Sequence, residues 1–174
     1  MDILRSLKER CDPKYAALIV VDVQNDFVSP QGSAAKRGED VSAAMAMVPN
    51  LRRLIDEARR VGLTIVYIRT THSEWTDTPS WVYRTSQKGA LSTCREGTWG
   101  AETHAAVAPT ERDFVFTRSI GVDGSYGTQL YPVLRMLGRD ALLVCGVSTN
   151  LAVEGLVRAS VHRGFEMFVV EGCG

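Results

Sequence analysis

The sequence has no apolar run long enough to cross a membrane. Its longest apolar stretches, such as AALIVV (16–21) and ALLVCGV (141–147), fall far short of the roughly 20 residues that a membrane-spanning helix needs. The N-terminal segment MDILRSLKER has no apolar core of the kind found in a signal peptide. We therefore expect a cytoplasmic protein that has no membrane partner.

The sequence also has no excess of either charge, because 20 Lys and Arg residues balance 20 Asp and Glu residues. Such a chain has no global field to attract nucleic acid. Its few cysteines form no CxxC pair and no cluster with His, so neither a disulfide framework nor a zinc site is expected; they are Cys11, Cys94, Cys145 and Cys173. The glycines of DGSYGT (123–128) match neither GxGxxG nor the P-loop, so we expect no nucleotide cofactor.

What the sequence does contain is a set of short apolar runs that alternate with helical patterns. The runs are apolar nearly throughout, which is typical of strands covered on both faces in a parallel sheet; they span residues 16–23, 63–70, 113–118, 141–147 and 165–170. Helical spacing is found at 41–60, 127–138 and 149–164. The alternation predicts a single α/β domain over residues 1–174, a three-layer αβα sandwich around a mostly parallel, Rossmann-like sheet of five to six strands.

Polar residues and a glycine-containing turn follow these runs where each strand is expected to end. In sheets of this kind ligands bind outside the carboxyl ends of the strands. The first run delivers Asp22, the third ends in Arg118, and the fourth opens onto GVSTNLAVEG (146–155). An isolated Asp more often caps a turn, but a buried Asp needs a nearby cation. Arg118 is the candidate for that cation, and we expect the three strand ends to meet at one pocket.

These stretches together resemble the isochorismatase-like hydrolases, a family that includes cysteine amidohydrolases. The resemblance rests on IVVDVQNDF (19–27), GTWGAE (97–102), the basic end of FVFTR (114–118), YGTQL (126–130) and GVSTNLAVEG, in this order, and it spans roughly residues 15–171. Each motif is weak alone, whereas five in the right order and spacing are specific.

The resemblance implies a catalytic triad of Asp, Lys and Cys, and this sequence departs from it twice. The Asp corresponds to Asp22, the basic position to Arg118, and the nucleophile position to Ala152. The resemblance also implies a cis peptide between Val147 and Ser148 and an oxyanion hole formed by the backbone N–H groups of Leu151 and Ala152. Those donors do not depend on the side chain at position 152.

Further residues are candidates for contact with a substrate. They are Gln24, Asn25, Phe27, Trp75, Tyr126, Val147, Ser148 and Leu151. The long segment 72–109 has no clear strand, so it is either a lid over the site or a packing arm in an oligomer. Some family members bind a metal near the second strand, but RTTHSEWTD (69–77) lacks that pattern, so we predict no metal and no cofactor.

The missing thiol leaves three interpretations open, since a methyl group cannot form an acyl-enzyme. The chain is a hydrolase that naturally lacks the Cys, an amidohydrolase altered at position 152, or a binding protein that keeps the pocket without turnover. Cys145 and Cys94 are weak candidates for a replacement nucleophile. The family is usually oligomeric, so we expect a homo-oligomer that acts on a small molecule. Its members continue with another helix and strand where this sequence stops at Gly174.

Overall fold

The computed structural model describes residues 6–174 and contains a five-stranded sheet in which every neighbouring pair of strands is parallel. The strands are β1 (Ala16–Val21), β2 (Thr64–Thr70), β3 (Phe114–Arg118), β4 (Ala141–Gly146) and β5 (Glu166–Val169), in the spatial order β3-β2-β1-β4-β5. From β1, the chain adds β2 and β3 on one side of the sheet and then β4 and β5 on the other, so the strand order reverses at β1. Sheets of this kind bind ligands at such a reversal. The α/β class and the parallel sheet predicted from the apolar runs are confirmed.

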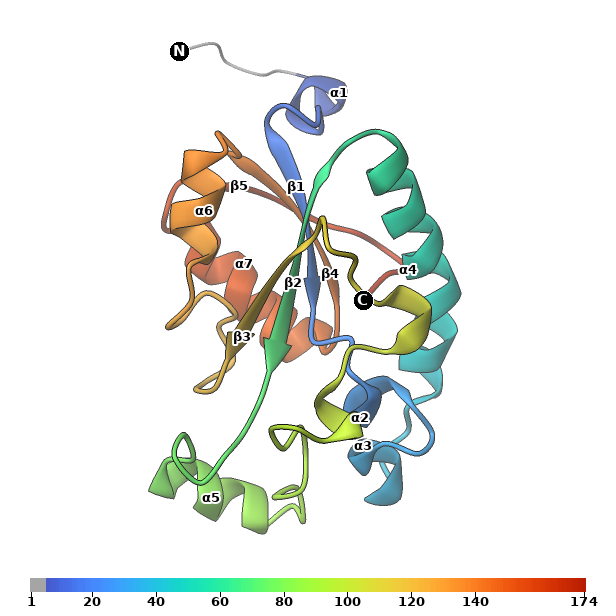
Figure 1. The fold of residues 1–174 in the computed structure, drawn as a ribbon, viewed down its shortest axis with the longest axis vertical. Coiled ribbons are helices and arrows are strands. Elements are labelled where there is room, and N and C mark those ends of the chain that lie inside the picture. Colours follow the sequence, from blue (N-terminus) through green and yellow to red (C-terminus); the bar gives the residue numbers. More distant parts are fainter. Residues whose placement is uncertain (1–5) are drawn as a thin grey trace.

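Helices cover both faces of the sheet, which explains why its central strands are apolar along their whole length. Helix α4 (Ser42–Arg60) lies on one face, and α6 (Leu130–Met136) and α7 (Glu154–Val161) lie on the other (Figure 1). Successive side chains of a strand point to opposite faces. In β1, Leu18 therefore joins the core under α4, while Ile19 joins the core under α6 and α7. Both are fully buried.

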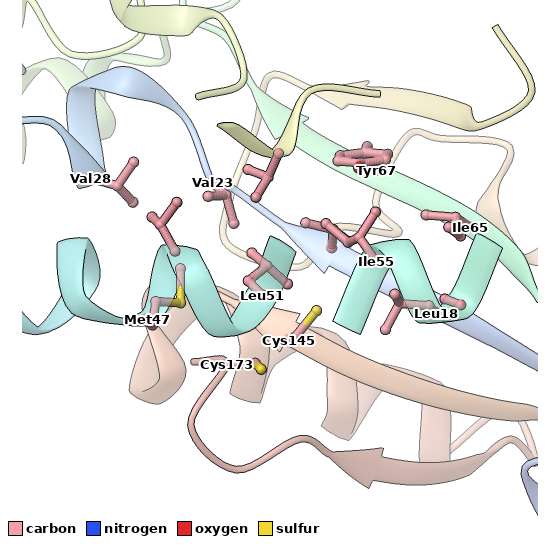
Figure 2. Close-up of a cluster of buried hydrophobic side chains, with 14 residues drawn as sticks. Leu18, Val23, Val28, Met47, Leu51, Ile55, Ile65, Tyr67, Cys145 and Cys173 are labelled. Atoms are coloured by element: carbon pink, nitrogen blue, oxygen red, sulfur yellow. The ribbon is translucent and has the colours of Figure 1, made fainter. Parts of the chain in front are cut away.

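The core under α4 is built from long aliphatic side chains of the helix and of the central strands. Leu51 and Ile55 of α4 lie one helical turn apart and are fully buried against the strands, near Leu18 and Tyr67 (Figure 2). Cys145 of β4 belongs to the same cluster. Burial of such side chains contributes roughly 1.5–3 kcal/mol each, which holds α4 on the sheet and fixes the strand ends below it.

The helices agree with the sequence patterns but their limits differ. Pro132 lies in the first turn of α6, where its missing N–H is not needed, so this helix begins at Leu130 rather than near residue 127. The helix predicted over 149–164 starts as a π-helical turn, Thr149–Val153, before α7 begins at Glu154. Ser148 therefore occupies the position before the first turn.

Short helices gather at the carboxyl edge of the sheet, toward the lower end of Figure 1. They are α2 (Asn25–Val28), α3 (Ser33–Lys36), α5 (Pro79–Ser86) and a 3₁₀ turn, Trp99–Ala101. A second 3₁₀ turn, Ala105–Val107, lies beside α4. Helix α1 (Leu7–Arg10) lies at the opposite end. In the part of the chain that the structure describes, no helix is both long and apolar enough to span a membrane.

Candidate active site

Asp22 and Arg118 form a buried ion pair at the carboxyl edge of the sheet. Asp22 directly follows β1, where its backbone N–H donates to the Ile68 carbonyl, and Arg118 ends β3 opposite Thr70 of β2. The Arg118 Nη1 and Nη2 atoms donate to the two Asp22 carboxylate oxygens at 2.7 and 2.6 Å. Both side chains are only 4% exposed. The pair therefore has the bidentate geometry that gives Arg–carboxylate contacts their strength and fixed orientation.

This environment sets the proton affinity of Asp22. Burial raises the pKa of the Asp22 carboxyl, and the charge and hydrogen bonds of Arg118 oppose that rise. A guanidinium stays charged at all ordinary pH values, and its two parallel hydrogen bonds are those made to an ionised carboxylate. Arg118 itself is held by a hydrogen bond from Nε to the Gly121 carbonyl at 3.2 Å. Arg118 thus fixes the orientation of the Asp22 carboxylate.

The turn after β4 brings the backbone of residues 146–152 up to this pair. The peptide bond between Val147 and Ser148 is cis, as the resemblance implies. Gly146 has a φ of +117°, and a Cβ atom there would lie 2.0 Å from the Val21 carbonyl oxygen. Only glycine allows the strand end to approach β1 so closely. Ala152, at the nucleophile position of the family pattern, is 3% exposed.

The two backbone donors expected to form an oxyanion hole are not equivalent. The Leu151 N–H donates to the Ser148 carbonyl at 3.1 Å, and the Val153 N–H donates to the same oxygen at 3.2 Å. The Leu151 donor is therefore already engaged within the turn. The Ala152 N–H makes no bond to this carbonyl, so of the two predicted donors it is the one that Ser148 does not engage.

These groups line a cavity of about 330 Å³ at the carboxyl edge. Among the residues predicted from the sequence, those in its wall are Asp22, Phe27, Arg118, Val147, Ser148, Leu151 and Ala152. A larger hollow of about 700 Å³ lies at the amino ends of β2 and β3. Its wall contains the Arg59–Asp113 ion pair, which already satisfies both charges. The cavity at the carboxyl edge is the one that combines a buried acid with a strand-to-helix turn.

Four residues predicted to touch a substrate lie outside the cavity wall. Gln24 is fully buried, and its side-chain amide binds the backbone of Thr70 and the carbonyl of Ala101. Asn25 likewise donates to the Trp99 carbonyl at 2.8 Å. Both amides therefore tie the loops around the site together. The two others, Trp75 and Tyr126, are 96% and 62% exposed.

The cysteines considered as replacement nucleophiles do not reach the cavity. Cys145 is fully buried in the core below α4, where its thiol faces the Ile19 carbonyl at 3.4 Å. Cys94 is also fully buried, with its thiol near the Gly100 carbonyl. Burial raises the pKa of both thiols far above the ordinary value. Neither sulfur is available as a thiolate that could attack a substrate in the cavity.

The structure adds residues to the site that the sequence motifs did not indicate. His72, which follows β2, lines the cavity and stacks on Trp81 with ring centroids 4.0 Å apart. The basic side chains of Arg37, Arg84 and Lys88 also line it. A signal was present for part of this set, because residues 81, 84, 85 and 88 have the spacing of one helix face. Between residues 6 and 174 the structure contains no group of three or more His, Cys, Asp or Glu side chains suited to a metal.

With the fold and the site described, comparison with known proteins defines the class. The chain matches the Isochorismatase domain model over residues 16–173. It therefore belongs to the isochorismatase-like hydrolase family. Among curated relatives, it is 29% identical over 171 residues to a ureidoacrylate amidohydrolase, RutB, of Methylobacterium radiotolerans, a match that covers 88% of this chain and 64% of that protein. A RutB of Caulobacter vibrioides is 29% identical over 167 residues, covering 84% of this chain and 71% of the relative.

Solved structures show the same fold. The crystal structure of a cysteine hydrolase from Pseudomonas syringae pv. phaseolicola matches with a TM-score of 0.81 at 24% identity, covering 93% of this chain and 73% of that one. N-carbamoylsarcosine amidase from Thermoplasma acidophilum matches with a TM-score of 0.76 at 27% identity, covering 91% and 83%. These matches confirm the αβα architecture, and the chain spans about two thirds of the length of the first curated relative named above.

Proposed function

We propose that this chain hydrolyses a small carbonyl compound with Asp22 as the base and without a nucleophilic thiol. The observation that carries the proposal is the buried, bidentate Asp22–Arg118 pair in the wall of a cavity that also contains Ala152. A carboxylate held in this way accepts a proton but has none to give at the start of a reaction. This favours amides and ureides over enol ethers, whose cleavage begins with protonation by an acid.

The proposed reaction uses a water molecule in place of the thiol. Asp22 accepts a proton from the water as its oxygen forms a bond to the substrate carbonyl carbon. The carbonyl oxygen becomes an oxyanion that accepts a hydrogen bond from the Ala152 N–H. When the C–N bond breaks, the Asp22 carboxylic acid returns its proton to the leaving nitrogen, which restores the carboxylate. Arg118 orients Asp22 throughout and exchanges no proton.

The names of the relatives support a C–N bond as the target. RutB is a ureidoacrylate amidohydrolase and the Thermoplasma protein is an N-carbamoylsarcosine amidase. Both names describe cleavage of nitrogen-linked carbonyl compounds. The substrate we favour for this chain is therefore an amide, ureide or carbamoyl compound small enough for a cavity of about 330 Å³.

The proposal is tested by turnover of small amides, ureides and isochorismate with the wild-type chain and with Asp22→Asn. Loss of a general base lowers kcat by about 10²–10⁴-fold, so we expect Asp22→Asn to abolish measurable turnover. Because the variant leaves Arg118 buried without its partner, the double variant Asp22→Asn with Arg118→Gln provides a second test in which neither charge remains. Arg118→Lys, which keeps the charge and restores the family residue, should retain activity. Turnover by a folded Asp22→Asn variant would refute the mechanism.

Ala152→Cys tests the second candidate, an amidohydrolase whose thiol is missing. Ala152 is buried in the cavity wall, so a thiol there would face the same substrate carbonyl. We expect Ala152→Cys to raise amide turnover and to form an acyl-enzyme detectable as an added mass, while Ala152→Ser, a weaker nucleophile, should not. Saturable binding without turnover by the wild type and by every variant would instead identify a binding protein.

A further inference from the structure

Helix α5 presents an unusual face to the cavity. Trp81, Arg84 and Thr85 lie on one side of the helix, and Lys88 lies two residues beyond its end at Ser86; all four residues line the cavity. A helix of an ordinary globular protein turns its apolar face inward. In α5, Val82 and Tyr83 lie outside the cavity wall and are 38% and 71% exposed. Arg84 of the helix and Lys88 just beyond it line the cavity, and both residues are also exposed to solvent.

These two cations are not neutralised by the protein. Among the described residues, neither Arg84 nor Lys88 has an ion pair or a side-chain hydrogen bond. Basic residues in the last turn of a helix also complement its dipole, but that role does not require either side chain to face a cavity.

The other charges of the cavity wall are already compensated. Arg118 is paired with Asp22, and Arg37 is paired with Glu39 at 2.8 Å and donates to the Thr93 hydroxyl at 2.8 Å. His72 carries no charge at neutral pH, since burial lowers the pKa of its imidazole. The wall therefore has an uncompensated positive charge that comes from Arg84 and Lys88, and a bound molecule with negative charge there would be stabilised.

We infer that Arg84 and Lys88 form an anion subsite, and that the molecule hydrolysed at Asp22 is a small carboxylate. This inference rests on the proposed function for the position of the reacting carbonyl. The planar guanidinium of Arg84 matches a carboxylate in a bidentate contact, and Lys88 adds a point charge. The substrate then spans the cavity, with its amide or ureide carbonyl at the Ala152 N–H and its carboxylate at α5.

Equilibrium binding tests this inference without requiring turnover. The probes are 3-ureidopropionate and its uncharged primary amide, which share the ureido group and differ at the carboxylate. We expect the wild type to bind the carboxylate at least about tenfold more tightly than the amide, the discrimination that a charge-assisted contact gives. Arg84→Ala and Lys88→Ala should each weaken carboxylate binding severalfold and leave amide binding unchanged, whereas Arg84→Lys should retain part of the affinity.

Lys8→Ala is the matched control, because it removes the same charge from exposed helix α1 at the opposite end of the molecule (Figure 1). It should bind both probes as the wild type does. Equal affinity of the wild type for the two probes, unchanged carboxylate affinity in Arg84→Ala, or no saturable carboxylate binding would overturn the inference. Tighter binding of inorganic phosphate than of the carboxylate would overturn the assignment to carboxylates. Discrimination between the probes without turnover would refute the proposed function alone.

Discussion

His72 is held in the cavity wall as a neutral imidazole. Its side chain is 11% exposed, it stacks on Trp81, and its Nδ1 atom lies 3.5 Å from an Asp77 carboxylate oxygen. Burial lowers the pKa of His72 most; Asp77 opposes the shift, and the nearby charges of Arg95 and Arg118 add to it. Asp77 is in turn paired with Arg95, so its charge is shared and does not draw a proton fully onto the imidazole.

This environment makes stability depend on pH. The unfolded chain binds a proton at His72 near the ordinary value of 6.5, whereas the folded chain binds it only at lower pH. The unfolded state therefore holds more protons between the two values, and the contribution of His72 to stability is present above pH 6.5 and falls as pH decreases through the folded pKa.

We predict that His72→Gln will reduce the loss of unfolding free energy between pH 7.5 and pH 5.5, measured by urea denaturation. The equivalent change at exposed His162 is the control and should leave the pH dependence as in the wild type. An identical pH dependence in His72→Gln and wild type would show that His72 does not cause the loss.

Single residues of the site were predictable from the sequence to different degrees. Asp22 directly follows β1 and Arg118 ends β3, so the topology of a parallel sheet is enough to predict that they meet. The roles of Gln24 and Asn25 depend on carbonyls of Ala101 and Trp99, more than 70 residues away in sequence, and no local pattern reports such bonds. Gln24 and Asn25 belong to the same sequence motif as Asp22, yet their side chains bind backbone atoms of the surrounding loops and lie outside the cavity wall.

At the scale of elements, the turn between β4 and α7 depends on the close approach of two backbones. Gly146 has no space for a Cβ atom, which would also contact the Val21 backbone nitrogen at 2.7 Å. Gly62, just past the end of α4, also has a positive φ of +77°, but no atom lies within 4 Å of its Cβ position. A substitution at Gly62 therefore tests the backbone conformation alone, whereas a substitution at Gly146 tests the backbone conformation together with a steric clash.

We expect Gly146→Ala to lower the free energy of unfolding by about 3 kcal/mol or more, since overpacking adds to a left-handed backbone. Gly62→Ala should lower it by about 1 kcal/mol through the backbone alone. Urea denaturation of both variants checks the difference. Equal losses would mean that the approach of β4 to β1 adjusts without cost, and the fixed position of the turn would then need another explanation.

Elements with a buried apolar surface were predictable, and α5 was not. The five apolar runs became the five strands because helices cover both faces of the sheet. Helix α5 has no buried residue, so it lacks the inward apolar stripe by which an amphipathic helix is detected. Its helical spacing lies in Trp81, Arg84 and Thr85, which line the cavity, so this pattern agrees with the anion subsite inferred above.

For the whole molecule, exposed aromatic residues of the segment 72–109 bear on the predicted homo-oligomer. Trp75 precedes α5 and is 96% exposed, and Tyr83 lies within α5 and is 71% exposed. Aromatic side chains are enriched at interfaces between proteins, and the chain has no net charge that would keep copies apart. A packing arm that presents its aromatics outward and its cations to the cavity is compatible with both roles predicted for this segment.

We predict that the wild type sediments as a dimer or larger assembly and that Trp75→Ser with Tyr83→Ser shifts it toward the monomer. The reason is that loss of two large apolar surfaces weakens association, by about 25 cal/mol for each Å² no longer buried. Met136→Ser is the control, since Met136 is 75% exposed on α6, which lies toward the other end of the sheet (Figure 1). Sedimentation velocity of the wild type, the double variant and Met136→Ser, all at one concentration, measures the assembly state of each protein. A monomeric wild type would refute the oligomer, whereas an assembly unaffected by the double substitution would place its interface outside α5.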